Sequence, residues 1–102
     1  MAIKTTTDEL DTNIFIDEYG IVYHIMDNEL HRTNGPAIEW PDGTQEWWVD
    51  GKRHRADGPA FISACGTEVL WYLNGVEVDQ ITHFVLRPEP TPNPNKVSNN
   101  GI

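Results

Sequence analysis

Two pairs of adjacent histidine and arginine residues are the part of this sequence best suited to chemistry. The pairs are His31-Arg32 and His54-Arg55, and each is followed by the same pattern, x-Asx-Gly-Pro-Ala. Histidine titrates near neutral pH, and arginine holds carboxylates or phosphates through two parallel hydrogen bonds. These four side chains are therefore candidates for an anion-binding site that would take a nucleotide or another small anion.

The same pairs also have a structural interpretation, which we favour. Both stand at the same place in a repeated passage, and a side chain that recurs with a repeat is expected to build that repeat. Each arginine would then stack on a tryptophan ring or pair with the Asx residue two positions later, Asn34 or Asp57. The two histidines would bond the carbonyl groups of turns.

The passage that contains these pairs occurs twice, at a spacing of 23 to 24 residues. Residues 31–37 return as residues 54–60, and residues 47–51 return as residues 71–75. A weaker leading copy precedes them. Self-similarity at a short fixed period is typical of proteins in which successive units stack and bury their apolar faces against one another.

Turn and strand signals lie at matching places in both copies. Asp50-Gly51 and Asn74-Gly75 are tight-turn dipeptides, since these residues tolerate a positive φ. The segments between turns are rich in β-branched and aromatic residues. The expected strands are residues 37–40, 44–49, 60–64 and 67–73. The sequence thus predicts an all-β protein, an antiparallel meander of hairpin repeats that forms one elongated, twisted sheet.

Three segments flank this repeat region, which we place at residues 13–78. Residues 1–12 are expected to form an N-terminal arm or cap. Residues 79–87 are expected to form a capping strand or a short helix that starts at Asp79, and their β-branched content favours the strand. Residues 88–102 are rich in proline and asparagine, which indicates a tail.

Composition and charge limit the classes of partner. Sixteen acidic and seven basic side chains give a formal charge of −9, so phosphates and anionic lipids repel this chain. We therefore expect neither nucleic acid nor a membrane as a partner. No apolar run approaches the roughly 20 residues of a membrane span, and the start of the chain has no signal-peptide core.

Motifs for catalysis and for cofactor binding are missing from the sequence. The four histidines lack the close spacing of a metal motif, and the single cysteine, Cys65, has no histidine near it in the chain. No nucleophile signature or phosphate-cradling glycine loop occurs. We therefore expect no enzyme activity, no cofactor and no metal.

Aromatic residues on both faces of the expected sheet indicate a surface for binding. A single-layer sheet has no second layer to cover its rings, so one aromatic face stays available. Buried aromatic side chains dominate the energy of protein interfaces. The residues that we expect to contact a partner are the aromatic Trp40, Trp48 and Tyr72 and the acidic Glu46, Asp17 and Glu18.

The passage from Gly43 to His54 resembles a MORN-type repeat, a family of short β-hairpin repeats. The similarity is closer to a variant with the pattern His-Arg-x-x-Gly-Pro-Ala, which is found in small proteins of tailed phages and large viruses. It covers about residues 13–78 and implies a scaffold for protein contact. Arg32 and Arg55 stand where MORN repeats have glycine, so a lipid-binding role is not carried over.

Together, these features predict a non-enzymatic protein-binding module. The small size and acidity of the chain, together with its resemblance to viral repeat proteins, imply a phage-encoded inhibitor that binds and blocks a host defence protein. Its expected location is the cytoplasm, that of the host if the chain is viral. One alternative is the anion or nucleotide binder that uses the His-Arg pairs. Another is a homodimer or larger homo-oligomeric structural protein, in which open sheet edges pair between copies.

Overall fold

The computed structural model describes residues 12–88 of the chain. Its elements are β1 Asn13–Ile16, β2 Val22–Met26, β3 Glu29–Leu30, β4 Ile38–Glu39, β5 Gln45–Glu46, β6 Trp48–Val49, β7 Lys52–Arg53, β8 Phe61–Ile62, β9 Val69–Leu73, β10 Val76–Val78 and α1 Gln80–Leu86. The expected arm at residues 1–12 and tail at residues 88–102 therefore lie almost wholly outside the described residues. Residues 12–88 contain no helix long and apolar enough to cross a membrane.

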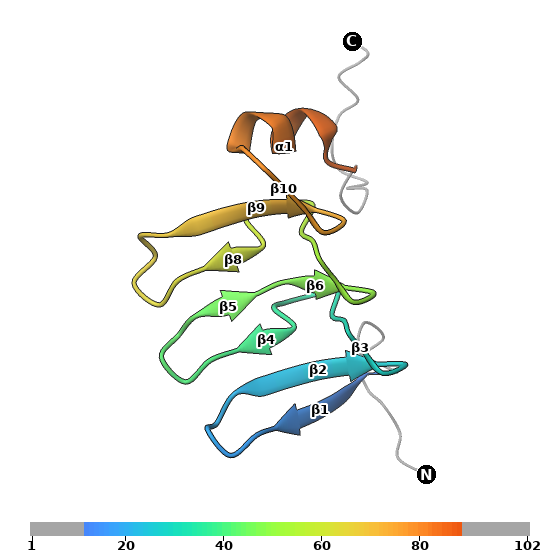
Figure 1. The fold of residues 1–102 in the computed structure, drawn as a ribbon, viewed down its shortest axis with the longest axis vertical. Coiled ribbons are helices and arrows are strands. Elements are labelled where there is room, and N and C mark those ends of the chain that lie inside the picture. The colour runs from blue at the N-terminus through green and yellow to red at the C-terminus, as the bar shows by residue number, and fades with distance from the viewer. Residues whose placement is uncertain (1–11, 89–102) are drawn as a thin grey trace, which may run out of the picture.

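The strands pair antiparallel throughout. An eight-stranded sheet follows the order β1-β2-β4-β5-β8-β9-β10 with β3 beside β2, while β6 and β7 form a two-stranded ribbon. Figure 1 shows the hairpins stacked in chain order, from β1 at one end to β9 and helix α1 at the other. The predicted all-β antiparallel meander is confirmed.

Tight turns close the hairpins where the sequence predicts them. Asp50 and Asn74 adopt φ values of 52° and 51°, and the glycines that follow them adopt 78° and 87°. The expected strand at residues 44–49 is divided at Trp47, because its two halves pair with different neighbours. Its first half, β5, pairs with β4 and β8, whereas its second half, β6, pairs with β7 across the turn.

Two alanines lie where successive hairpins meet. Ala37 and Ala60 are completely buried, each at 0 % exposure. The Ala37 N–H donates to Glu46 O at 2.8 Å, and the Ala60 N–H donates to Leu70 O at 2.8 Å. Each alanine carbonyl also accepts a backbone N–H from the preceding hairpin, so a small side chain lets adjacent backbones approach closely.

The interior of the described region is small and unusually polar. Its buried hydrophobic residues are Ile21, Ala37, Ile38 and Ala60, and its buried polar or charged residues are Thr12, His24, Glu46 and His83. Most of the aromatic rings are half-buried. Because so few aliphatic side chains are buried, the rings and the polar groups that contact them carry much of the packing.

Residues 80–86 form helix α1, so our preference for a strand in this segment is wrong. The Asp79 carboxylate caps the helix by accepting the Thr82 N–H at 2.7 Å. On the inner side, His83 is 2 % exposed, and its Nε2 lies 2.6 Å from the carbonyl oxygen of Arg55. This cap and this one buried contact outweigh the β-branched content, which is only a weak preference.

Candidate functional site

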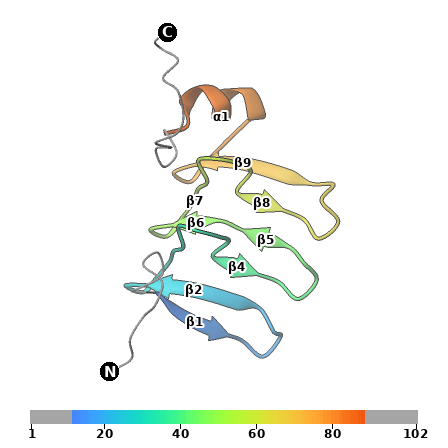
Figure 2. The ribbon, with the colours of Figure 1, turned by 180° about the vertical axis from the view of Figure 1, so that it is seen from behind.

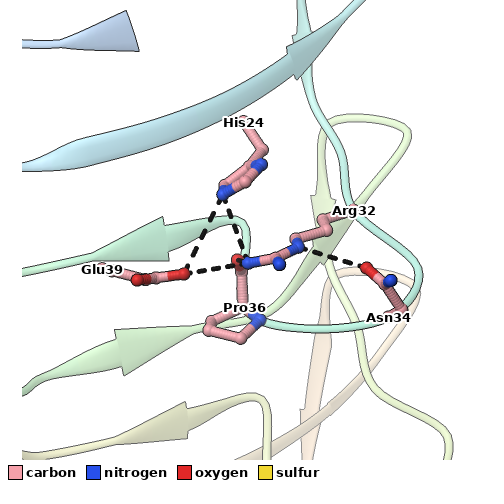
Figure 3. Close-up of polar contacts among 5 residues, drawn as sticks. All are labelled: His24, Arg32, Asn34, Pro36 and Glu39. Carbon is pink, nitrogen blue, oxygen red and sulfur yellow. Dashed lines mark hydrogen bonds and ion pairs between the residues drawn. The ribbon is translucent and has the colours of Figure 1, made fainter. Parts of the chain in front are cut away.

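Arg32 folds back over the loop that follows it. Its Nε donates to Asn34 Oδ1 at 3.2 Å, and its Nη1 donates to Pro36 O at 3.1 Å and to Glu39 Oε2 at 2.9 Å (Figure 3). The same Nη1 lies 3.2 Å from His24 Nε2. The guanidinium therefore closes the loop and ties it to the preceding hairpin, as the structural interpretation predicts.

Arg55 repeats this arrangement in the second copy. Its Nε donates to Asp57 Oδ1 at 3.1 Å, its Nη1 donates to Pro59 O at 3.1 Å, and its Cζ lies 3.9 Å from the centre of the Trp47 ring. Steric contact with the arginine explains why the repeated pattern has a glycine at this position. A Cβ atom on Gly58 would stand 2.8 Å from Arg55 Cζ, so a side chain there would displace the guanidinium.

The two histidines of the pairs hold the turns of the adjacent hairpin ends. His31 Nδ1 accepts the Asp50 N–H at 3.1 Å, and His54 Nδ1 accepts the Asn74 N–H at 2.9 Å. The expected contact with turn carbonyls is therefore wrong, because turn amides donate to these rings instead. Each accepting Nδ1 must be unprotonated for this bond to form.

Three of the four residues proposed for anion binding line one cavity. Arg32, His54 and Arg55 border a space of about 450 Å³, and His31 is not part of its lining. Carboxylates and carbonyls already accept hydrogen bonds from both guanidinium groups, as described above. The cavity thus retains less cationic character than the sequence pattern suggests, and the structural role of the pairs is the better supported one.

Burial lowers the pKa of His54 below its usual 6.5, and the charge of His83 adds to this effect. His54 therefore binds a proton less readily in the folded state than in the unfolded chain. Its contribution to the free energy of unfolding is complete above pH 6.5 and is lost as the pH falls below that value. We expect the urea midpoint to decrease between pH 7 and pH 5, and to decrease less in His54→Asn.

A second decrease of the urea midpoint, at lower pH, serves as the internal control for this titration. Hydrogen bonds from the Thr44 and Thr82 backbone amides lower the pKa values of Asp42 and Asp79 below 3.8. The stability that these carboxylates contribute is lost only below that pH, and it should be the same in both chains. An identical decrease between pH 7 and pH 5 in His54→Asn would contradict the assignment to His54.

Glu46 and Arg53 form an ion pair inside a cluster of aromatic rings. Arg53 Nη2 lies 2.8 Å from Glu46 Oε1, and Glu46 is only 6 % exposed. The Glu46 carboxylate also accepts the indole N–H groups of Trp40 at 2.9 Å and Trp48 at 3.1 Å. The expectation that Glu46 lies on the binding surface is therefore wrong.

The guanidinium of Arg53 covers two of the three rings that we expected to be available to a partner, those of Trp48 and Tyr72, and also the ring of Phe61. Its Cζ lies 5.2 Å from the centre of the Trp48 ring, 5.6 Å from that of Phe61 and 5.1 Å from that of Tyr72. Trp48 and Tyr72 are accordingly half-buried. This arginine takes the place of a second layer over the sheet, which alternation along the sequence did not indicate.

An aromatic groove lies between two hairpin loops at the N-terminal end of the stack. It encloses about 630 Å³, and its lining residues are Asp17, Tyr19, Ile21, Tyr23, Trp40, Pro41 and Asp42. Tyr19 is 72 % exposed and Trp40 is 40 % exposed. Figure 1 shows that the loops between β1 and β2 and between β4 and β5 project at the same end of the paired strands.

Asp17 organises this groove. Its Oδ1 accepts the N–H groups of Tyr19 at 2.9 Å and Ile21 at 3.0 Å, and its Oδ2 accepts the Tyr23 hydroxyl at 2.9 Å. Burial alone would raise the pKa of Asp17, but these hydrogen bonds prevail and lower it below 3.8. The hydrogen bond to Asp17 also raises the pKa of Tyr23 above 10.0. At neutral pH the groove thus combines a charged carboxylate with neutral rings.

The groove itself was not predicted from the sequence. Asp17 and Trp40, two of the residues that we expected to contact a partner, line it, and Glu18 is exposed beside it. Tyr19 and Tyr23 were missed. The turn pattern Asp-x-Tyr-Gly at residues 17–20 is the signal that could have indicated Tyr19, since an aspartate there fixes the loop that presents the ring.

The described residues include no group of three histidine, cysteine, aspartate or glutamate side chains placed to hold a metal ion. The arrangement that they do provide is an open aromatic groove with acidic residues at its margin, which suits binding. No protein-family model, no curated protein and no solved structure matches this chain.

Proposed function

We propose that this protein is a non-enzymatic binding module whose aromatic groove receives side chains of a partner protein. The observation that carries the proposal is the exposure of Tyr19 and Trp40, two aromatic residues that line the same groove. Tyrosine and tryptophan are strongly enriched among the residues that dominate interface energy. Both rings stand on loops that the sheet supports, so binding would cost little additional ordering.

Charge defines the chemistry of the partner. Asp17, Glu18 and Asp42 lie in or beside the groove, and the whole chain has a formal charge of −9. Ring faces and carboxylates both attract cations. The partner is therefore a protein that presents lysine or arginine side chains among apolar ones.

We also propose that the chain is a MORN-like repeat protein. Two backbone hydrogen bonds that link neighbouring hairpins support this: the His24 N–H donates to Ala37 O, and the Trp47 N–H donates to Ala60 O, both at 2.8 Å. Figure 2 shows the stacked hairpins from behind. In this proposal the partner is a host defence protein of a phage-infected cell, for example a nuclease, whose basic nucleic-acid site an acidic inhibitor would occupy.

The experiment is capture from a bacterial lysate with the immobilised full chain, followed by titration of the purified captured protein. Tyr19→Ala removes an exposed ring. Within residues 12–88 the hydrogen bond of Tyr19 is made by its backbone N–H, which alanine retains, so folding should be unchanged. We expect its affinity for the partner to decrease about tenfold or more, the loss typical of a central interface residue.

Val69→Ala is the control, because Val69 is also an exposed apolar residue, at 40 %, but lies on a different hairpin from Tyr19 and does not line the groove. It should bind with unchanged affinity. A captured protein that binds Tyr19→Ala and the unmodified chain equally would reject the groove as the binding surface. Far-UV circular dichroism of each variant verifies that folding is intact.

A further inference from the structure

Helix α1 turns its apolar side chains away from the sheet. Ile81 is 77 % exposed, Phe84 is 67 % exposed, Val85 is 69 % exposed and Leu86 is 64 % exposed. Its inner contact is His83, which is 2 % exposed and lies 4.9 Å from the Trp71 ring, centre to centre. A surface helix ordinarily buries its apolar face and exposes its polar one. In α1 this arrangement is reversed.

The exposed side chains form one surface at the end of the stack. Residues 81, 84 and 85 lie on one helix face, since positions three and four apart are neighbours on a helix. In Figure 1, α1 lies beyond β9, at the opposite end of the molecule from β1. Contiguous exposed apolar surface of this kind marks an interaction site.

The two ends of the helix have opposite charges. Asp79 caps its N-terminus, and Arg87 follows its C-terminus with its Cζ 4.9 Å from the Phe84 ring. An identical helix that runs antiparallel to α1 would bring the Arg87 end of each helix level with the Asp79 end of the other. The same pairing sets Ile81 opposite Val85, because both residue pairs are centred on position 83.

We propose that this surface binds a second copy of the chain, with two α1 helices antiparallel about a two-fold axis. Such a contact is self-complementary in apolar side chains and in charge. It also accommodates the net charge of −9, because residues 80–88 contain no acidic side chain and two acidic copies can approach there with the least repulsion. This dimer is independent of the aromatic groove.

Sedimentation velocity of the full chain from low to high micromolar concentration tests the proposal. The unmodified chain should shift from monomer to dimer, and Phe84→Glu should stay a monomer throughout. Ile14→Glu is the matched control, since Ile14 is 60 % exposed at the other end of the stack, and it should dimerise normally. An unmodified chain that remains a monomer would overturn the proposal. So would dissociation by Ile14→Glu alone, which would place the contact at β1.

Cysteine cross-linking tests the orientation without disrupting the apolar contact with a charge. The exposed Cys65 is first replaced by serine, and Ile81→Cys and Val85→Cys chains are prepared separately. The antiparallel arrangement predicts that an oxidised mixture forms the Ile81–Val85 cross-link faster than either chain links to itself. If the Val85→Cys chain instead links to itself faster than the mixed cross-link forms, the helices are parallel and the proposed arrangement is contradicted.

Discussion

Replacing Arg53 with methionine is expected to lower the free energy of unfolding by about 3–5 kcal/mol, the usual cost of removing one partner of a buried ion pair. Glu46 would remain buried and charged, and the rings of Trp48 and Tyr72 would lose the guanidinium that covers them. A domain of this size has roughly 5–15 kcal/mol of stability in total. Urea unfolding followed by tryptophan fluorescence measures the loss.

Lys52→Met is the control for this variant, because Lys52 is the exposed neighbour of Arg53 on β7. Its stability should remain within about 0.5 kcal/mol of the unmodified chain. Adding Glu46→Leu to Arg53→Met should restore only part of the loss, since two indole N–H groups then lack their acceptor. A loss below about 1 kcal/mol in Arg53→Met would show that the pair is screened like a surface pair.

Replacing His83 with alanine is expected to cost about 2–4 kcal/mol and to release helix α1 from the sheet. The imidazole supplies the buried contact with the Arg55 carbonyl and packs against the Trp71 ring. An isolated helix of this length is unstable in water, so its far-UV signal should disappear with the contact. Urea unfolding and amide hydrogen exchange of residues 80–86 measure the two effects.

Phe84→Ala is the control for His83→Ala, because it changes the exposed face of the same helix. Phe84 follows His83 directly but is 67 % exposed, so its removal should change the stability of the monomer little. If Phe84→Ala destabilises the monomer as much as His83→Ala, the orientation of α1 described above is wrong. Dilute samples are required, because Phe84 also belongs to the proposed dimer contact.

Local features of the sequence predicted the turns and hairpins correctly. The Asp50-Gly51 and Asn74-Gly75 turns form where expected, because the ability to adopt positive φ belongs to those residues themselves. The arginine contacts with Asn34 and Asp57 were also predictable, since each pair is separated by two positions in the chain. Alternation likewise placed Glu46 and Trp48 on the same side, and their side chains are hydrogen-bonded.

Features that depend on which distant segments meet could not be predicted in this way. Alternation does not reveal what covers a face, so the burial of Glu46 against Arg53 was missed. Tyr19 joins Trp40 in a groove only because two separate loops project at the same end of the paired strands.

The sequence by itself determined the hairpins and their spacing, because short-range backbone preferences at the turns decide them. The tertiary structure alone decided that residues 80–86 are helical and which way that helix faces. His83 reaches the Arg55 carbonyl across 28 positions of the chain. Whether a side chain is buried in this way depends on the distant residues that pack against it, and the sequence of one segment does not specify those residues.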